Sequence, residues 1–121
     1  MQLFDEIVDY SKKKVLNITN ISSKITHIYE QYVYQIGNVV MFLLYVDVGS
    51  TFNNSEQICK IEGAYPLISF PIMGCGSGGI HSIWIIRDGS SNNAVINSGG
   101  VNPVIAGSYV FISGMYVTQQ R

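Results

Sequence analysis

The sequence predicts an all-β protein, an antiparallel β-sandwich of jelly-roll-like form preceded by a short N-terminal helix. From Lys24 onward β-branched and aromatic residues dominate, and glycine and asparagine separate them into short runs. Turn signals recur between the runs, and no central segment has helical period, which favours a sandwich. A length of 121 residues suits a single core. We expect a helical neck or linker over residues 1–16 and a β-sandwich domain over residues 17–121.

The first 15 residues have the spacing of an amphipathic helix. The residues that recur at helical spacing are Leu3, Phe4, Ile7, Val8, Ser11 and Val15. Acidic residues precede the lysines at 12–14, an order that suits the helix dipole. Because about four turns alone are marginal in water, the helix needs something to pack on. It either lies on its own domain or forms a neck shared between identical chains.

Strands and turns follow one another along the rest of the chain. We expect strands at about 25–35, 38–48, 57–61, 67–73, 80–87, 94–98 and 108–118. Gly37-Asn38 is typical of a hairpin turn between the first two strands. Asp88-Gly89 marks another turn, which residues 90–93 widen into a loop. The glycine-rich stretch 74–79 is interpreted as a connection between strands.

The second expected strand is apolar on both faces, from Val39 to Val46. An antiparallel sheet usually packs one face and exposes the other, so we expect the opposing sheet on one side and a neighbouring subunit on the other. Charged residues make up only 12% of the chain, about half the usual share, which also favours subunit burial. Closed rotational symmetry is the usual arrangement. The residues predicted to lie at this subunit interface are Phe4, Val8, Val15, Val40, Phe42 and Leu44.

Composition and motifs exclude several classes of function. A formal net charge of −1 with seven basic residues excludes a nucleic-acid-binding groove. The longest apolar run is far shorter than the roughly 20 residues of a membrane helix, so we expect no membrane insertion. No nucleophile elbow, P-loop or metal-ligand spacing occurs, so we expect no enzymatic activity, no cofactor and no metal. Cys59 and Cys75 are interpreted as reduced, buried side chains, with their pairing left open.

One strand and the loop after it carry the side chains of a saccharide site. An aromatic ring packs against the apolar face of a sugar, and polar side chains bond its hydroxyls. The predicted saccharide-binding residues are His81, Trp84, Arg87, Asp88, Asn92 and Asn93. The alternative is that Trp84, the only tryptophan, belongs to the core and that the polar residues form an ordinary loop. Eight tyrosines also suit an interface or a hydrated recognition surface.

Four segments, in order, resemble motifs of distal receptor-binding domains in phage tail fibres and baseplate proteins. Tyr32 to Val40 resembles their Y-x-x-I-G-N-x-V hairpin. Ile61 to Pro66 resembles their L-P-x-G-Y-x-P stretch but lacks its Leu-Pro. Ile83 to Ile96 resembles their V-x-I-x-x-D-G-x-I hairpin, and Ile105 to Thr118 resembles their closing strand, which ends in G-x-Y-x-T.

The resemblance covers roughly residues 30–121 and implies a β-sandwich head that forms a homotrimer at a fibre tip. It implies a non-enzymatic protein of the virion, exposed to the extracellular medium and joined to other tail or baseplate proteins. Its partner on the host would be a cell-surface polysaccharide. The alternative hypothesis is a structural trimerisation or adaptor module of a phage baseplate, fibre or capsid. A small enzyme acting on polysaccharide is the third.

Overall fold

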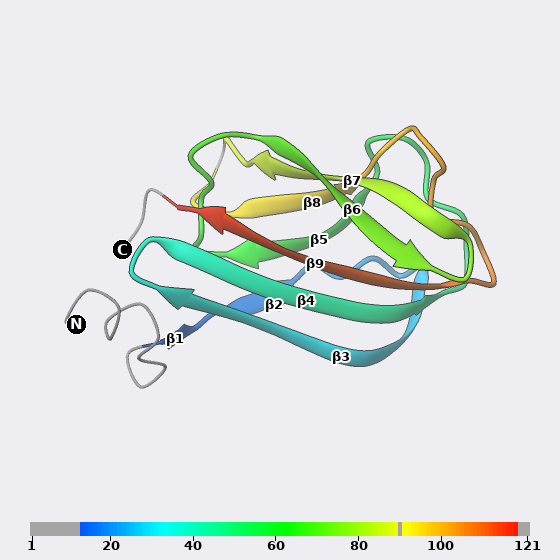
Figure 1. Cartoon of the computed structure of the whole chain (residues 1–121), viewed down its shortest axis with the longest axis horizontal. Helices are drawn as coiled ribbons and strands as arrows, with labels where there is room; N and C mark the ends of the chain where they lie inside the picture. The colour runs from blue at the N-terminus through cyan, green and yellow to red at the C-terminus, as the bar shows by residue number, and fades with distance from the viewer. Residues whose placement is uncertain (1–12, 90, 119–121) are drawn as a thin grey trace.

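The computed structural model describes residues 13–89 and 91–118, and within them all regular structure is β (Figure 1). The strands are β1 (Lys14–Val15), β2 (Asn17–Thr19), β3 (Ile25–Ile36), β4 (Val39–Val48), β5 (Gln57–Glu62), β6 (Phe70–Gly76), β7 (Gly79–Arg87), β8 (Ala94–Ser98) and β9 (Tyr109–Val117). Every pair of neighbouring strands is antiparallel. The predicted all-β, antiparallel class is therefore confirmed. No helix among the described residues is long and apolar enough to cross a membrane.

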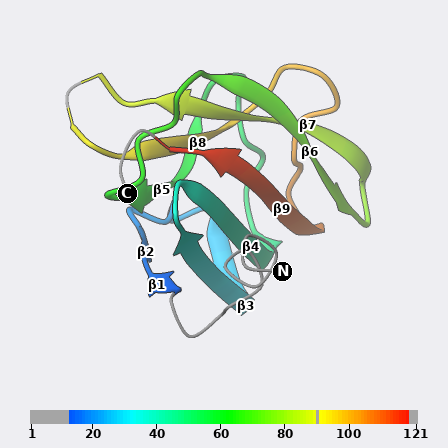
Figure 2. The same cartoon turned by 60° about the vertical axis from the view of Figure 1, so that its left-hand side comes forward.

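The strands form one sheet that curves back on itself into a nearly closed barrel (Figure 2). Their order is β1-β3-β4-β9-β6-β7-β8-β5-β2. β1 pairs with β3 at one end of this order, and β2 pairs with β5 at the other. Only Leu16 separates β1 from β2, so a single short segment joins the two ends of the sheet. The strands pair as one sheet, and the predicted jelly-roll sandwich is not confirmed.

The predicted helix over residues 1–16 falls mostly outside the described residues, which begin at Lys13. Where the prediction can be compared it is wrong, because Lys14 and Val15 form strand β1. The Leu16 amide donates a hydrogen bond to the Val33 carbonyl at 3.0 Å, and the Leu16 side chain is buried in the core. Pairing with the edge of β3 thus satisfies backbone groups and buries an apolar side chain at the same time.

One hydrophobic core fills the barrel, and the inward side of β4 lies in it. Val40, Phe42 and Leu44 are all 3% exposed or less and belong to this core. Their assignment to the trimer interface is therefore wrong, because they are already covered by their own chain. Val15 is exposed, whereas Phe4 and Val8 lie outside the described residues.

The hairpin turn at Gly37-Asn38 is confirmed, with Gly37 at φ +60° between β3 and β4. The sixth strand differs from expectation, because β6 includes the glycines at 74 and 76 that were predicted as a connection. These glycines let β6 approach β9 closely, and a Cβ on Gly76 would collide with the Tyr109 carbonyl oxygen. The β6–β9 pairing joins the two halves of the sheet through Gly74, Cys75 and Gly76.

The two cysteines are free and lie on opposite sides of the sheet. Cys59 is buried in the core, and burial raises the pKa of its thiol to about 12. Cys75 is exposed, so the expectation that both thiols are buried is wrong for this one. Its neighbours Gly74 and Gly76 leave room for β9, while its own side chain points outward.

Candidate functional site

The predicted saccharide residues of β7 lie on opposite faces of that strand. Successive side chains in a strand point to opposite faces, so positions 81 and 84 cannot share one. His81 is fully buried, with Nδ1 2.7 Å from the Asn102 carbonyl oxygen. Trp84 is 40% exposed on the outer face. His81 therefore takes no part in a surface site around Trp84, and the alternative that Trp84 is a core residue is also wrong.

The polar residues of the loop after β7 hold the loop itself. Asp88 accepts a hydrogen bond from the Ser91 hydroxyl at 2.7 Å and pairs with Lys60 Nζ at 3.2 Å. Asn93 Oδ1 accepts a hydrogen bond from the Gly63 amide at 3.0 Å. Arg87 lies over the Tyr65 ring, with 4.9 Å between Cζ and the ring centroid. Of these polar residues only Asn92 is exposed without such a contact among the described residues, so this loop offers few groups to a ligand.

A second set of side chains forms a compact aromatic surface on the outside of β3, β4 and β9. We call it the tyrosine cluster, and it consists of His27, Tyr29, Tyr45, Asp47, Tyr109 and Phe111. Tyr29 stacks on Tyr45 at 4.7 Å and 29°, and Phe111 lies 5.7 Å from Tyr45. Tyr109 meets the same Tyr45 ring edge-on at 6.2 Å, and His27 meets Tyr29 at 4.6 Å. The rings therefore hold one another in place on three paired strands.

The rings of the tyrosine cluster remain open to solvent on one side. Tyr29, Tyr109 and Phe111 are 50%, 47% and 43% exposed. The position of Tyr29 depends on an irregularity in the pairing of β3 with β4 between Ile28 and Glu30. This β-bulge adds a residue to one strand and turns a side chain out of the regular alternation. The excess of tyrosine is visible in the sequence, but the bulge that brings Tyr29 onto Tyr45 is not.

A carboxylate lies at the edge of the tyrosine cluster. The Tyr29 hydroxyl donates a hydrogen bond of 2.7 Å to Asp47 Oδ2. This bond raises the pKa of Tyr29, with smaller contributions from burial and from the negative charges of Asp47 and Tyr45. The Tyr29 phenol is therefore the donor of this hydrogen bond, and Asp47 Oδ2 is its acceptor. Among the described residues, Asp47 Oδ1 has no hydrogen-bond partner.

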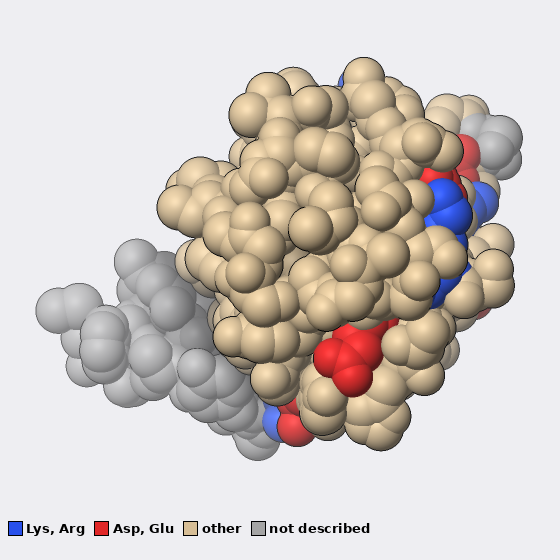
Figure 3. All heavy atoms as spheres, turned by 90° about the vertical axis from the view of Figure 1, so that its right-hand side faces the viewer, with Lys and Arg blue, Asp and Glu red and all other residues tan. Residues whose placement is uncertain are grey.

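Four of the five lysine and arginine side chains among the described residues make their contacts outside the tyrosine cluster. Lys24 and Lys60 form ion pairs with Glu56 and Asp88. Arg87 lies over Tyr65, and Lys13 Nζ lies 4.3 Å from the centroid of the Tyr34 ring. Figure 3 looks onto the end of the barrel where β4 ends and β9 begins. It shows a largely uncharged surface with acidic atoms in it and basic atoms near its margins.

The outer face of β9, β6 and β7 continues the apolar surface. Its exposed apolar side chains are Met73, Ile80, Trp84, Met115 and Val117. Phe111 of the tyrosine cluster is paired with Cys75, which in turn is paired with Ile80, so the two surfaces are continuous. Such an extended apolar face on a small domain is typical of an interaction surface.

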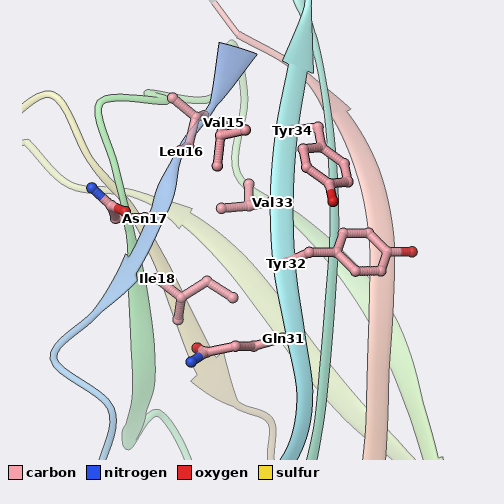
Figure 4. Close-up of a pocket in the computed structure, with 8 residues that line it drawn as sticks. All are labelled: Val15, Leu16, Asn17, Ile18, Gln31, Tyr32, Val33 and Tyr34. Atoms are coloured by element: carbon pink, nitrogen blue, oxygen red, sulfur yellow. The ribbon is translucent and has the colours of Figure 1, made fainter. Parts of the chain in front are cut away.

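A hollow of about 270 Å³ separates the β1–β2 segment from β3 (Figure 4). It arises because the chain stops pairing with β3 after Leu16 and pairs with β5 from Asn17 onward. Ile18 and Gln31 point toward each other across it, whereas the rings of Tyr32 and Tyr34 turn away. Half of the eight lining residues are aliphatic, and none of the lining side chains is ionisable as an acid or base other than the two tyrosines.

The described residues contain no group of three histidine, cysteine or carboxylate side chains that could hold a metal ion. Comparison of the chain with protein-family models, curated proteins and solved structures finds no match.

Proposed function

We propose that this chain is a non-enzymatic receptor-binding head domain of a phage tail fibre or baseplate, which attaches to the host by binding cell-surface saccharides as a homotrimer. The observation that carries the proposal is the exposed aromatic surface on β3, β4 and β9, with a carboxylate beside it. Aromatic rings pack against the apolar faces of sugars, and carboxylate and phenol oxygens bond hydroxyls.

The proposed subunit contact is the outer face of β9, β6 and β7. Met73, Ile80 and Met115 are each more than half exposed there. With charged residues at 12% of the chain, few ionic groups are available to solvate this face. A neighbouring copy that covered it would bury large apolar side chains without a charge to desolvate. Three copies would also present three weak saccharide sites together, so that avidity strengthens attachment.

The resemblance to phage receptor-binding motifs also supports the proposal, because its four motifs follow one another in order along the strands and turns of the barrel. Its first motif falls on the β3–β4 hairpin, its second on the end of β5 and the turn after it, its third on β7 and β8, and its last on the approach to β9 and the strand itself. The exposure of such a head to the extracellular medium, and its attachment to other virion tail or baseplate proteins, are part of the same proposal.

The second candidate function is a structural trimerisation or adaptor module of a phage baseplate, fibre or capsid. The polar loop after β7 favours it, because Asp88 and Asn93 are used in holding the loop. In this case the apolar outer face would serve assembly alone.

Light scattering and a glycan array on the whole chain separate these functions. A homotrimer has a mass of about 40 kDa, three times the 13.4 kDa of one chain. We expect that mass together with binding of a saccharide at about micromolar to millimolar affinity. A trimer that binds no saccharide and no host cells supports the structural module. A mass near 13.4 kDa contradicts the homotrimer.

A further inference from the structure

The rings of the tyrosine cluster are in contact with one another and form one continuous aromatic surface, against which a sugar ring can pack. Tyr109 and Phe111 each lie about 6 Å from the central Tyr45, at 6.2 and 5.7 Å between centroids. A pyranose has a comparable width, and its axial C–H groups pack against the faces of such rings. Because Tyr29 already stacks on Tyr45, the surface is ordered before any ligand arrives. Binding therefore costs little side-chain entropy.

Oxygen atoms surround these rings at the places where sugar hydroxyls would lie. The proton of the Tyr29 hydroxyl is used in the bond to Asp47, so the phenol oxygen is left as an acceptor. Asp47 Oδ1 is a second acceptor, and the hydroxyls of Tyr45 and Tyr109 have no partner within the described residues. The cluster thus offers both acceptors and donors around an apolar platform.

The charged side chains in and beside the tyrosine cluster favour uncharged sugars over acidic ones. Asp47 lies in the cluster, and Glu30 is paired with Tyr45 across the two strands. The contacts of Lys13, Lys24, Lys60 and Arg87 all lie outside the cluster. In the cluster an anionic sugar would meet the carboxylates of Asp47 and Glu30 and the imidazole of His27, but no lysine or arginine, whereas an uncharged sugar would meet no such repulsion.

We propose that the tyrosine cluster is the saccharide site and that its ligand is a neutral pyranose, not an acidic sugar. The inference rests on the proposed function, since it names the site and the sugar class for that binding activity. It places the site at the end of the barrel formed by β3, β4 and β9. The Trp84 loop that the sequence predicts is not part of it.

The test uses the whole chain on an array of neutral glucose, galactose and N-acetylglucosamine oligomers beside uronic-acid and sialic-acid oligomers of the same length. The best neutral glycan is then titrated by calorimetry. We expect Tyr109→Ala to weaken binding about tenfold or more, because it removes an exposed stacking face. Tyr29→Phe should weaken binding several-fold, because it removes the acceptor oxygen. Tyr32→Ala is the control for Tyr109→Ala, since Tyr32 is an exposed tyrosine of β3 that lies outside the cluster.

A charge reversal tests the sugar class without disturbing the rings. Glu30 is exposed, so Glu30→Lys should fold normally while adding a cation beside Tyr45. We expect this variant to gain affinity for acidic oligomers and to keep its affinity for neutral ones within a few-fold. A wild-type preference for acidic oligomers would overturn the assignment of a neutral sugar.

The outcomes separate this inference from the proposed function. If the wild type binds no saccharide, both fail. If it binds and Trp84→Ala abolishes binding while Tyr109→Ala and Tyr29→Phe do not, the function stands and the site is wrong. If Tyr109→Ala instead splits an oligomer in light scattering, the cluster is a subunit contact, which also overturns the inference. Thermal melts of each variant show whether a loss of binding reflects a loss of folding.

Discussion

The two faces of β4 are both apolar, yet they are covered in different ways. On the inward face Phe42 and its alternate neighbours are buried in the core. On the outward face Met41 and Tyr45 are partly exposed, and Leu43 is buried without belonging to the core. Neighbouring strands thus shield part of the outer face with their own side chains. An apolar strand does not by itself require a second subunit. Only the apolar side chains that stay exposed after this shielding indicate an interaction surface.

The largest expected difference between the faces is in the response to truncation. Phe42→Ala removes an aromatic ring from the closed interior and should lower the free energy of unfolding by about 3–5 kcal/mol. Met41→Ala, one residue away on the outer face, should lower it by only about 1 kcal/mol, because its site is partly solvated. Urea denaturation at a fixed chain concentration measures both. Equal losses would mean that the outer face is packed as firmly as the core.

The junction between β6 and β9 tests whether the closed barrel depends on close backbone approach. Gly76→Ala places a Cβ against the Tyr109 carbonyl, so the strands must separate, at a cost of about 2–3 kcal/mol. Gly89→Ala is the control, because a Cβ there meets nothing within 4 Å. The midpoint of urea unfolding reports both variants. A stability of Gly76→Ala equal to that of the control would show that the β6–β9 pairing adapts easily.

The third comparison is between a buried tyrosine hydroxyl and an exposed one, and its expected effect on stability is smaller. Tyr116 is buried, and its hydroxyl donates a hydrogen bond to the Ala64 carbonyl at 2.9 Å. Tyr116→Phe leaves that carbonyl without this donor and should cost about 1–2 kcal/mol. Tyr29→Phe removes a hydrogen bond on the exposed face and should leave the melting temperature nearly unchanged. A larger loss for Tyr29→Phe than for Tyr116→Phe would contradict the distinction between the two faces.

Strands and hairpins could be predicted from the sequence because their signals are local. A run of β-branched and aromatic residues predicts β4 correctly, and the turn residues before it predict the Gly37 turn. The closure of the barrel could not, because pairing of residues 14–19 with β3 and β5 depends on contacts far away in the sequence. The prediction of a connection at Gly74 and Gly76 is wrong because the local signal itself is misleading there. Glycine usually marks a turn, but here it allows two backbones to come close.

The candidate site was predictable only in part. Strand alternation alone shows that positions 81 and 84 face opposite ways, so the separation of His81 from Trp84 was available from the sequence. The tyrosine cluster was not, because Tyr29 reaches Tyr45 through a bulge in β3 and Tyr109 reaches it from a strand more than sixty residues later. Tyrosine content indicated a recognition surface, and only the strand pairing shows where it lies.

The smallest expected effect comes from an ion pair at the surface, where Glu56 accepts hydrogen bonds from the Asn53 amide at 2.9 Å and from Lys24 Nζ at 2.7 Å. The backbone bond first, and then Lys24, lower the pKa of Glu56 in the folded chain. Stability from this group is therefore present above the unfolded pKa of about 4.3 and is lost as pH falls through the lower folded value. Between pH 3 and 7, the melting temperature of Glu56→Gln should fall less on acidification than that of the wild type. Lys24→Gln should keep part of the wild-type pH dependence, because the Asn53 bond remains. Identical pH profiles for the wild type and Glu56→Gln would show that solvent replaces both bonds at no cost, as at an ordinary exposed carboxylate.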